Sequence, residues 1–406
     1  MKHYIFLSRS NPYQANGASA NRTRGLLEGI IAQGGKIHFY ILSPFFSRNE
    51  KLEYFNFQQN SPSGLKLIYL SSILFGNAYM ERFYKYILSY FFEIIFAFML
   101  KKVLSDFNGV VFTTPDYYLM KQLCKLKTKN PKLIIVCEIS EYLDYYKSQD
   151  IPKWLLPQLI RTEKFFVNQF VNCLSGCVVM TKALYSFIED LNLPNIKLLH
   201  LPMTVDLSRF ENPQKPSLNF KKPYILFVGV MNNAKDGVDI LIDSYYETNT
   251  KFHQYNLYLV GPWQYDTPGH LDKIKTLGLT GKVNWINEVQ RDEIPPILKE
   301  ASLLVLPRPD SKQAQGGFPT KLGEYLASGI PICATSVGEI PDYLTNNETV
   351  FFAEPGSVGS FAKAMDRALS NPELAKKVGM AGRNIAEIHF NKDIQSQKLH
   401  KFLQNL

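Results

Sequence analysis

The residues with the clearest potential for chemistry lie between positions 302 and 341. The apolar run from Ser302 to Leu306 is typical of a buried parallel strand. A polar loop with the pair Gly316-Gly317 follows, and then Pro319 stands where the first turn of a helix tolerates proline. A strand, a glycine loop and a charged helix start together predict a site for phosphate and sugar groups.

The helix predicted from Pro319 to Ala327 has two different sides. Leu322, Tyr325 and Leu326 recur at helical spacing and are expected to face a sheet. Lys321 and Glu324 then lie near its beginning on the other side, which faces the ligand. Gly329 and Pro331 are expected to end the helix.

The stretch GFPTKLGEYLASGIPICAT resembles the signature of the retaining nucleotide-sugar glycosyltransferases of family 4, in the branch that reads Pro-Thr-Lys-Leu-x-Glu-Tyr-Leu-Ala. The resemblance implies the α/β fold called GT-B, in which two Rossmann-like, doubly wound parallel sheets face each other across a cleft. It also implies transfer of a sugar from a nucleoside diphosphate to an acceptor hydroxyl with retention of the anomeric configuration. In that family the carboxylate matching Glu324 accepts hydrogen bonds from the donor ribose.

The donor diphosphate needs positive partners. In the family an arginine and a lysine hold it. Lys235 matches the lysine, but Val230 stands at the arginine position, so Lys321 and Arg308 are candidates to compensate. Lys235 and then Lys321 are our predictions for neutralising the leaving diphosphate, with solvated surface charge as the alternative.

The donor sugar poses a second question, because the family commonly carries Glu-x(7)-Glu and Gly316 occupies the first of these positions. Backbone N–H groups of Gly316, Gly317 and Phe318 are expected to replace the missing carboxylate. The predicted donor-binding residues are Gly17, Gly229, Lys235, Arg308, Gly316, Gly317, Phe318, Pro319, Thr320, Lys321 and Glu324.

The first half of the chain supplies two weaker candidates. Gly17 lies in a loop between the strand Tyr4 to Ser8 and a helix starting near Ser19, where it either lets backbone N–H groups approach a ligand or forms a simple turn. Glu138, just past the predicted strand from Leu133 to Cys137, is a catalytic candidate on the acceptor side or else a helix-start carboxylate.

The length of 406 residues predicts two domains. Residues 1–205 form the expected acceptor-binding domain and residues 206–385 the donor-binding domain, with a proline-rich linker at 211–223. Residues 386–406 resemble the helix that crosses back to the first domain in GT-B enzymes.

The net charge is +9, and the whole excess lies in residues 1–205. This half also holds an aromatic segment at 45–98 with a helix predicted at 79–104, which is either a core helix or a surface that docks on a bilayer. The basic charge favours an anionic partner such as a membrane surface, a lipid pyrophosphate or a polyanion. Together with the aromatic residues, it predicts a lipid-linked or saccharide acceptor and peripheral contact with an anionic membrane. The alternative interpretation is that the basic surface serves only solubility.

Several classes are disfavoured. No Asp-x-Asp occurs in the chain, so we expect no metal and no cofactor besides the donor substrate. The chain has no Gly-x-Gly-x-x-Gly directly after a predicted strand, which disfavours a dinucleotide oxidoreductase. A GT-B protein that binds a nucleotide or a sugar without catalysis stays an alternative because of Val230 and Gly316. No feature indicates nucleic acid as a partner. Five scattered cysteines and the short apolar start predict a reducing, cytoplasmic location, with the inner membrane face as an option.

Overall fold

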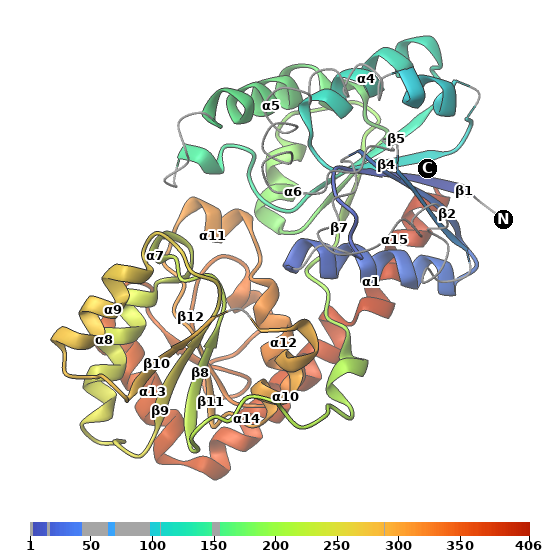
Figure 1. The fold of residues 1–406 in the computed structure, drawn as a ribbon. Coiled ribbons are helices and arrows are strands. Elements are labelled where there is room, and N and C mark those ends of the chain that lie inside the picture. Colours follow the sequence, from blue (N-terminus) through green and yellow to red (C-terminus); the bar gives the residue numbers. More distant parts are fainter. Residues whose placement is uncertain are drawn as a thin grey trace, which may run out of the picture. The chain divides into compact units, whose positions relative to one another are not determined.

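The computed structural model describes residues 3–13, 17–42, 64–69, 98–105, 107–147, 155–287 and 289–406. These form two compact units (Figure 1). The first contains the described residues up to Leu201 except Lys147, together with Ser396–Leu406, and the second contains Lys147 and Pro202–Gln395. Most of the predicted aromatic segment and of the predicted 79–104 helix lies outside the described residues.

The first unit is built on a parallel sheet of seven strands in the order β3-β2-β1-β4-β5-β6-β7. The strands are β1 His3–Ser8, β2 Lys36–Ile41, β3 Leu65–Tyr69, β4 Val110–Thr113, β5 Ile134–Ile139, β6 Gly176–Val179 and β7 Lys197–His200. The order starts at the centre and runs outward on one side before it returns to the other. This is the doubly wound arrangement, which leaves helices on both faces.

Alternate side chains of β1 serve the two faces of this sheet, as the pleat of a strand requires. Tyr4 and Phe6 belong to one core with Leu399, which comes from the end of the chain. Ile5 and Leu7 belong to the other core. The helices of this unit are α1 Ala18–Ala32, α4 Tyr117–Lys129, α5 Leu156–Asn168, α6 Lys182–Glu189 and the end of α15 Lys392–Gln404, with short helices η2 Tyr145–Lys147 and η3 Phe170–Cys173.

Local sequence signals place two of these helices. The Asp116 carboxylate accepts hydrogen bonds from the N–H groups of Tyr118 and Leu119 and so begins α4. The Thr181 hydroxyl accepts from the N–H of Leu184, 3.3 Å away, and begins α6. Each cap satisfies backbone donors that a helix start leaves without partners.

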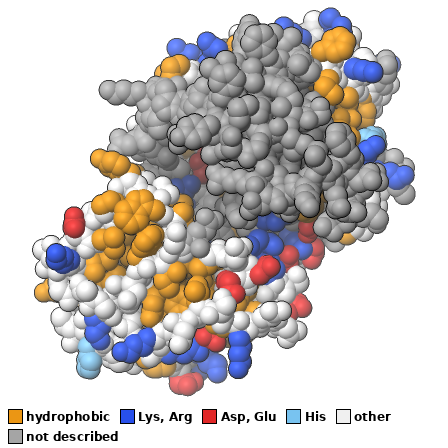
Figure 2. All heavy atoms as spheres, viewed as in Figure 1, with side chains coloured by type: hydrophobic (Ala, Val, Ile, Leu, Met, Phe, Trp, Pro, Cys, Tyr) orange, Lys and Arg blue, Asp and Glu red, His pale blue; other side chains and the backbone are white. Residues whose placement is uncertain are grey.

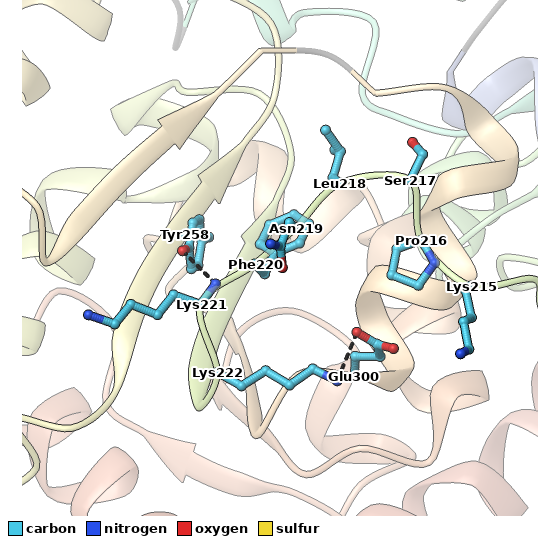
Figure 3. Close-up of a pocket in the computed structure, with 10 residues that line it drawn as sticks. All are labelled: Lys215, Pro216, Ser217, Leu218, Asn219, Phe220, Lys221, Lys222, Tyr258 and Glu300. Carbon is cyan, nitrogen blue, oxygen red and sulfur yellow. Dashed lines mark hydrogen bonds and ion pairs between the residues drawn. The ribbon is translucent and has the colours of Figure 1, made fainter.

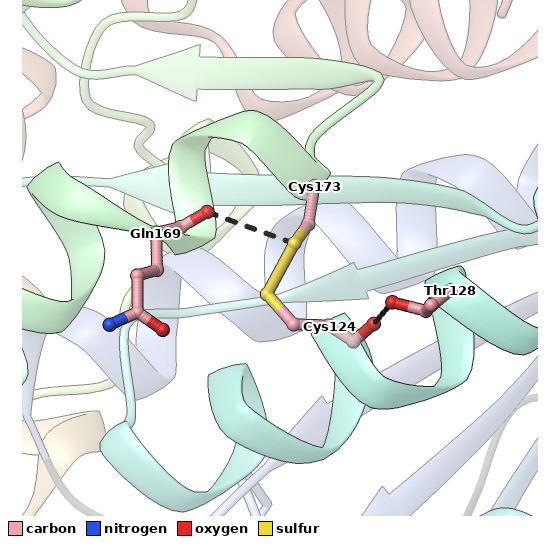
Figure 4. The surroundings of a disulfide bond; sticks show 4 residues. All are labelled: Cys124, Thr128, Gln169 and Cys173. Atoms are coloured by element: carbon pink, nitrogen blue, oxygen red, sulfur yellow. Dashed lines mark hydrogen bonds between the residues drawn. A yellow bond between two sulfur atoms is a disulfide. The ribbon is translucent and has the colours of Figure 1, made fainter.

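Two cysteines of the first unit are joined. Cys124 of α4 and Cys173 of η3 form a disulfide whose Cα atoms lie 5.7 Å apart (Figure 4). They are 49 residues apart in the sequence, so their spacing alone did not single them out. Cys137, Cys177 and Cys333 are free and buried. Disulfides are rare in reducing compartments, so this bond weakens the prediction of a reducing location that was based on the cysteines.

Two histidines of the first unit are expected to make the free energy of unfolding depend on pH. Burial lowers the pKa of His3 and of His38, whose rings lie 4.1 Å apart, and nearby lysine charges lower both further. As the pH falls below about 6.5, the unfolded chain therefore takes up protons before the native state does, and the free energy of unfolding decreases. We expect a lower thermal unfolding midpoint at pH 5.5 than at pH 7.5.

A matched pair of variants checks this expectation. His38→Gln removes one of the two groups and is expected to reduce the difference between the two midpoints. His253→Gln replaces an exposed histidine of the second unit and is expected to leave it unchanged. Equal pH dependence in wild type and His38→Gln would show that other groups govern acid stability.

The second unit contains a parallel sheet of six strands in the order β10-β9-β8-β11-β12-β13. The strands are β8 Tyr224–Val228, β9 Asn256–Val260, β10 Val283–Ile286, β11 Leu303–Leu306, β12 Ile332–Thr335 and β13 Phe351–Ala353. Among the described pairings of this sheet every neighbour is parallel. The carboxyl ends of all six strands therefore meet at one edge, where sheets of this kind bind ligands.

Helices cover this sheet too. One core joins Ile225 and Phe227 of β8 to Leu241 of α8 and Phe361 of α13. The helices are α7 Asn233–Asp236, α8 Val238–Asn249, α9 Thr267–Thr276, α10 Ile294–Lys299, α11 Lys312–Gly316, α12 Thr320–Ser328, α13 Val358–Ser370 and α14 Pro372–Ile385, with short helices η4 Leu207–Phe210, η5 Arg291–Glu293, η6 Ile340–Asp342 and η7 Ala386–Phe390. Among the residues that the structure describes, no helix has both the length and the apolar character that crossing a bilayer requires.

Candidate active site

Helix α12 carries the predicted phosphate and sugar residues. Leu322, Tyr325 and Leu326 are buried, whereas Lys321 and Glu324 are partly exposed, as the spacing predicted. Pro319 is the N-cap and does not lie inside the first turn, and Gly329 ends the helix with φ of 74°. Only glycine adopts that backbone conformation at low cost. The Tyr325 hydroxyl fixes the helix to the sheet by accepting a hydrogen bond from the N–H of Val228 at 2.7 Å.

The centre of the site is an ion pair between Lys321 and Asp236. Lys321 Nζ lies 2.7 Å from Asp236 Oδ1, and the side chains are 19% and 2% exposed. The amine also lies 4.7 Å from the centre of the Phe227 ring. Burial lowers the pKa of Lys321, the contact with Asp236 opposes this, and the positive charges of Arg308 and Lys235 lower it further. The structure thus brings together three of the predicted cationic residues.

Gly229 leaves room for this amine. A Cβ atom at Gly229 would lie 2.1 Å from Lys321 Nζ. Gly261 approaches from the next strand, since a Cβ there would lie 1.7 Å from the carbonyl oxygen of Gly229. Both glycines directly follow strands, so the ends of β8 and β9 close tightly around the Lys321 side chain. Position 229 therefore requires glycine for a steric reason.

Lys235 lies in a short helix that sequence reasoning missed. Lys235 and Asp236 both lie in the four-residue α7, and α8 begins after Gly237. Gly237 has φ of 67°, so the chain bends between the helices. The bend turns Asp236 inward to Lys321, and Asp236 was not predicted as a site residue. The only sequence signal was an acidic residue directly after the predicted lysine.

The glycine pair is not a loop, contrary to the prediction. Gly316 ends the short helix α11, and Gly317 is its C-cap. The N–H of Gly317 donates to the carbonyl of Gln313 at 2.9 Å, so it is already used within the protein. The carbonyl of Gly317 accepts a hydrogen bond from the buried Arg308 guanidinium at 3.3 Å. Arg308 therefore supports the segment that leads into α12 from within. Phe318 and Pro319 are buried in this segment, and Thr320 is partly exposed.

Glu324 has a partner that the sequence did not reveal. Arg209 of η4 donates from Nη1 to Glu324 Oε1 at 2.7 Å. Residues three apart on a helix are neighbours, so Glu324 lies one turn beyond Lys321 on the same side of α12. Arg209 belongs to the sequence DLSRF, which follows the predicted end of the first domain. That motif was the available signal.

A polar network supports α7 from behind. The N–H of Asn233 donates to Asp266 at 2.8 Å, and the Asn233 side-chain oxygen accepts from the N–H of Asp239 at 3.0 Å. The ring of His270 is buried, and its Nδ1 lies 2.8 Å from Asp239. Three helices thus fix the backbone on which Lys235 and Asp236 stand.

Aromatic side chains flank the same strand ends. Trp263 and Trp285 pack edge to face with ring centres 5.1 Å apart, and Trp285 Nε1 donates to the carbonyl of Gly261 at 3.1 Å. Trp263 is 52% exposed and Tyr265 is 92% exposed. Figure 2 shows hydrophobic side chains gathered on the second unit, over the part where Figure 1 shows α7. An exposed aromatic ring near a cationic group suits a nucleotide.

The two candidates of the first unit stand apart from this cluster in the chain. Gly17 is the exposed N-cap residue of α1. Glu138 lies within β5, so the prediction that it follows the strand is wrong. It is buried and pairs with Arg22 at 2.7 Å, and Arg22 also donates to the carbonyl of Leu201. This pairing favours a structural role, because a buried arginine without its carboxylate is unfavourable. Catalysis by Glu138 stays a prediction.

A pocket of about 680 Å³ lies at the other end of the second sheet (Figure 3). It is formed by residues 215–222, which lead into β8, and by Tyr258 and Glu300. Lys222 pairs with Glu300 at 3.0 Å, while Lys215 and Lys221 point in different directions. The pocket therefore lacks convergent charges, and it lies away from the edge where parallel sheets bind ligands.

Metal binding finds no obvious place in the part of the chain that the structure describes. There, no group of three or more histidine, cysteine, aspartate or glutamate side chains is arranged to hold an ion. The expectation of a metal-independent site stays a prediction.

Comparison with known proteins identifies the fold. Residues 208–385 match the family model described as glycosyl transferases group 1. Sucrose-phosphate synthase from Thermosynechococcus elongatus superposes with a TM-score of 0.73 at 14% identity and covers 100% of this chain and 99% of its own. The chain has the GT-B fold. With two wholly parallel sheets in the described residues, this confirms the predicted fold class.

The match to the glycosyl transferases group 1 model supports a glycosyltransferase, and two further proteins are similar to this chain. Anabaena HepE, solved in complex with UDP and glucose, matches the GT-B chain with a TM-score of 0.68 at 13% identity, with all of both chains covered. Amylovoran biosynthesis glycosyltransferase AmsK of Erwinia amylovora is 26% identical over 117 residues, which is 29% of this chain and 29% of that protein. The alignment thus spans under a third of this curated relative. The family 4 assignment and its motif branch stay predictions.

Proposed function

We propose that the protein transfers a sugar from a nucleoside diphosphate sugar to an acceptor hydroxyl and retains the anomeric configuration, in the synthesis of a cell-surface polysaccharide or glycolipid. The observation that carries the proposal is the cluster of Lys321, Asp236, Lys235 and Arg308 at the carboxyl ends of β8 and β11. Positive charge at such strand ends suits a diphosphate.

The charges of the cluster suggest a different role for each of its cationic side chains. The Lys321 charge is already offset by Asp236, so the net positive potential comes from Lys235 and Arg308. A diphosphate entering the site draws Lys321 partly away from Asp236. Lys321 then donates to a phosphate oxygen, and the pair keeps the amine oriented until the ligand arrives. Such preorganised donors are most effective where charge develops in the transition state.

The chemical step follows from this arrangement. The bond from the anomeric carbon to the phosphate oxygen breaks, and the acceptor oxygen forms its bond from the same face. The acceptor proton moves to the leaving phosphate oxygen, so no protein base is required. Lys321 and Lys235 stabilise the negative charge that accumulates on the diphosphate.

The nucleoside is assigned to the neighbouring groups. Trp263 and Trp285 offer a surface on which a nucleobase stacks, and Glu324 accepts a hydrogen bond from the ribose. The named complex of Anabaena HepE with UDP supports UDP as the first diphosphate to test. The donor sugar itself stays unassigned, because Gly316 stands where related sequences place a carboxylate.

The acceptor is assigned to the first unit. The basic excess of residues 1–205 favours an anionic, lipid-linked saccharide at the inner membrane face. Co-sedimentation with vesicles that contain anionic lipid is expected to retain part of the protein at low salt and to release it at high salt. A protein that stays in the supernatant under both conditions would remove the membrane from the proposal.

The donor site is tested by ligand-induced stabilisation and by Lys235→Ala. We expect one nucleotide sugar of a panel of UDP, GDP and ADP sugars to raise the thermal unfolding midpoint, since a ligand at 100 times its dissociation constant adds about 2.7 kcal/mol. Lys235→Ala loses one charge-assisted contact and is expected to weaken binding about 10- to 100-fold. Lys251→Ala is the matched control, because Lys251 is an exposed lysine paired with Asp366. Equal binding by Lys235→Ala and wild type would refute the role of Lys235.

The alternative is a GT-B protein that binds nucleotide or sugar without transferring it. Val230 and Gly316 favour this alternative, because each replaces a side chain that related sequences use. Incubation of the nucleotide sugar that binds best with candidate acceptors decides between the two. Release of nucleoside diphosphate that Lys235→Ala abolishes supports catalysis, and NMR of the glycosylated product tests retention. Binding without any release supports the alternative.

A further inference from the structure

The ion pair between Arg209 and Glu324 has a geometry that goes beyond simple charge pairing. Arg209 Nη1 donates to Glu324 Oε1 at 2.7 Å, while Nη2 donates to the carbonyl of Arg291 at 2.5 Å. The side chains of Arg209 and Glu324 are 12% and 24% exposed. The guanidinium is planar and is held from both nitrogens, so it has little freedom to turn. It therefore presents a fixed hydrogen-bond donor to Glu324.

One oxygen of the Glu324 carboxylate, Oε1, accepts the hydrogen bond from Arg209, and the other, Oε2, can accept one from a ligand. The terminal torsion of a glutamate is broad when nothing holds it. Arg209 removes this freedom by anchoring Oε1. Within the described residues no hydrogen bond is recorded to Oε2, so that oxygen is left to accept a hydroxyl.

Arg209 also changes the charge of this part of the site. Glu324 lies one helical turn from Lys321, next to the place proposed for the diphosphate. A carboxylate there repels a diphosphate, and the repulsion is strong in a partly buried site. The positive charge of Arg209 offsets it. Arg209 thus permits a ribose-binding carboxylate to stand beside a dianionic group.

We propose that Arg209 is a positioning residue for ribose recognition: it fixes the plane of the Glu324 carboxylate and offsets its charge, so that Oε2 accepts a hydrogen bond from a ribose hydroxyl. This inference rests on the proposed function, which assigns Glu324 to the ribose. It adds Arg209 as the residue that determines how well the protein distinguishes a ribonucleotide from a deoxyribonucleotide.

The test compares the dissociation constants of UDP and 2′-deoxy-UDP by titration calorimetry, with GDP and ADP and their 2′-deoxy forms as further pairs. Wild type is expected to prefer the ribonucleotide about ten-fold or more, because a hydrogen bond to a charged group contributes in that range. Glu324→Gln is expected to reduce the preference. Arg209→Ala is expected to bring the ratio of the two dissociation constants towards one, with little change in the dissociation constant of the deoxynucleotide. Arg209→Lys keeps the positive charge but lacks the planar guanidinium, and its preference for the ribonucleotide is expected to lie between those of wild type and Arg209→Ala.

A purely structural role for Arg209 gives a different result. Loss of local structure weakens both nucleotides alike and leaves their ratio unchanged, so an unchanged ratio in folded Arg209→Ala or Arg209→Lys overturns the inference. Arg383→Ala is the matched control, because Arg383 pairs with Glu387 at 3.0 Å elsewhere in the second unit. If wild type binds none of the three diphosphates, the proposed function fails as well. If wild type discriminates and Arg209→Ala discriminates equally, only the inference about Arg209 fails.

Discussion

Replacing Lys321 by alanine is expected to abolish most of the proposed transfer activity and to destabilise the second unit at the same time. Loss of a preorganised cationic donor lowers catalytic rates by about 100- to 1,000-fold. The same change leaves Asp236, which is 2% exposed, as a buried charge without its partner. Breaking a buried pair in this way costs about 3–5 kcal/mol in the free energy of unfolding. Activity assays and urea unfolding measure the two effects.

A double variant separates these effects. Lys321→Met combined with Asp236→Asn removes both charges and keeps most of the volume, and such replacements of buried pairs are often neutral or stabilising. We therefore expect stability near that of wild type without recovery of transfer. Full activity in the double variant would show that the Lys321 charge is not needed and would reassign its role to Lys235 or Arg308.

Gly261→Ala has the second largest expected effect. A Cβ atom at Gly261 would lie 1.7 Å from the carbonyl oxygen of Gly229, and backbone atoms of two adjacent strands have little room to separate. Gly229 in turn contacts the Lys321 amine, so the displacement reaches the ion pair. We expect the free energy of unfolding to fall by about 3 kcal/mol and the dissociation constant of the donor to rise at least about ten-fold.

Gly269→Ala is the control for this substitution. Gly269 lies in α9, and apart from its chain neighbours and the backbone of its own helix a Cβ atom there would have no atom within 4 Å. Alanine is preferred to glycine in a helix by about 1 kcal/mol, so this variant is expected to match or exceed wild type in stability. Comparable losses in both variants would mean that the close contact between the ends of β8 and β9 is not what requires glycine at position 261.

The sequence by itself determined the elements that depend on local patterns. Apolar runs predicted two strands to within one residue, since Tyr4 to Ser8 corresponds to β1 His3–Ser8 and Ser302 to Leu306 corresponds to β11 Leu303–Leu306. Gly329 marked the end of α12, because the left-handed conformation at a helix end depends on a few neighbouring residues. The density of the motif around Lys321 and Glu324 identified the fold before any contact was known.

Other local predictions failed where tertiary contacts outweigh weak propensities. Five residues before Gly317 form α11, since the Ser311 hydroxyl accepts from the N–H of Ala314 at 3.2 Å and begins a helix there. Lys235 and Asp236 lie in one helical turn that Asn232 caps in the same way. Glu138 lies inside β5, because its side chain is neutralised by Arg22 and a charged residue can then occupy a buried strand.

The partners of the site residues were decided only by the tertiary structure. Asp236 lies 85 positions from Lys321 and Arg209 lies 115 positions from Glu324, and no spacing rule relates residues so far apart. Parallel strands bring Asp236 and Lys321 together, because the carboxyl ends of β8 and β11, which they follow, meet at the same edge of the sheet. Arg209 precedes β8 in η4, so its contact with Glu324 depends on how η4 packs in this unit. Sequence patterns therefore identified which residues can bind a diphosphate and a ribose, whereas only the fold determined which opposite charges hold them in place.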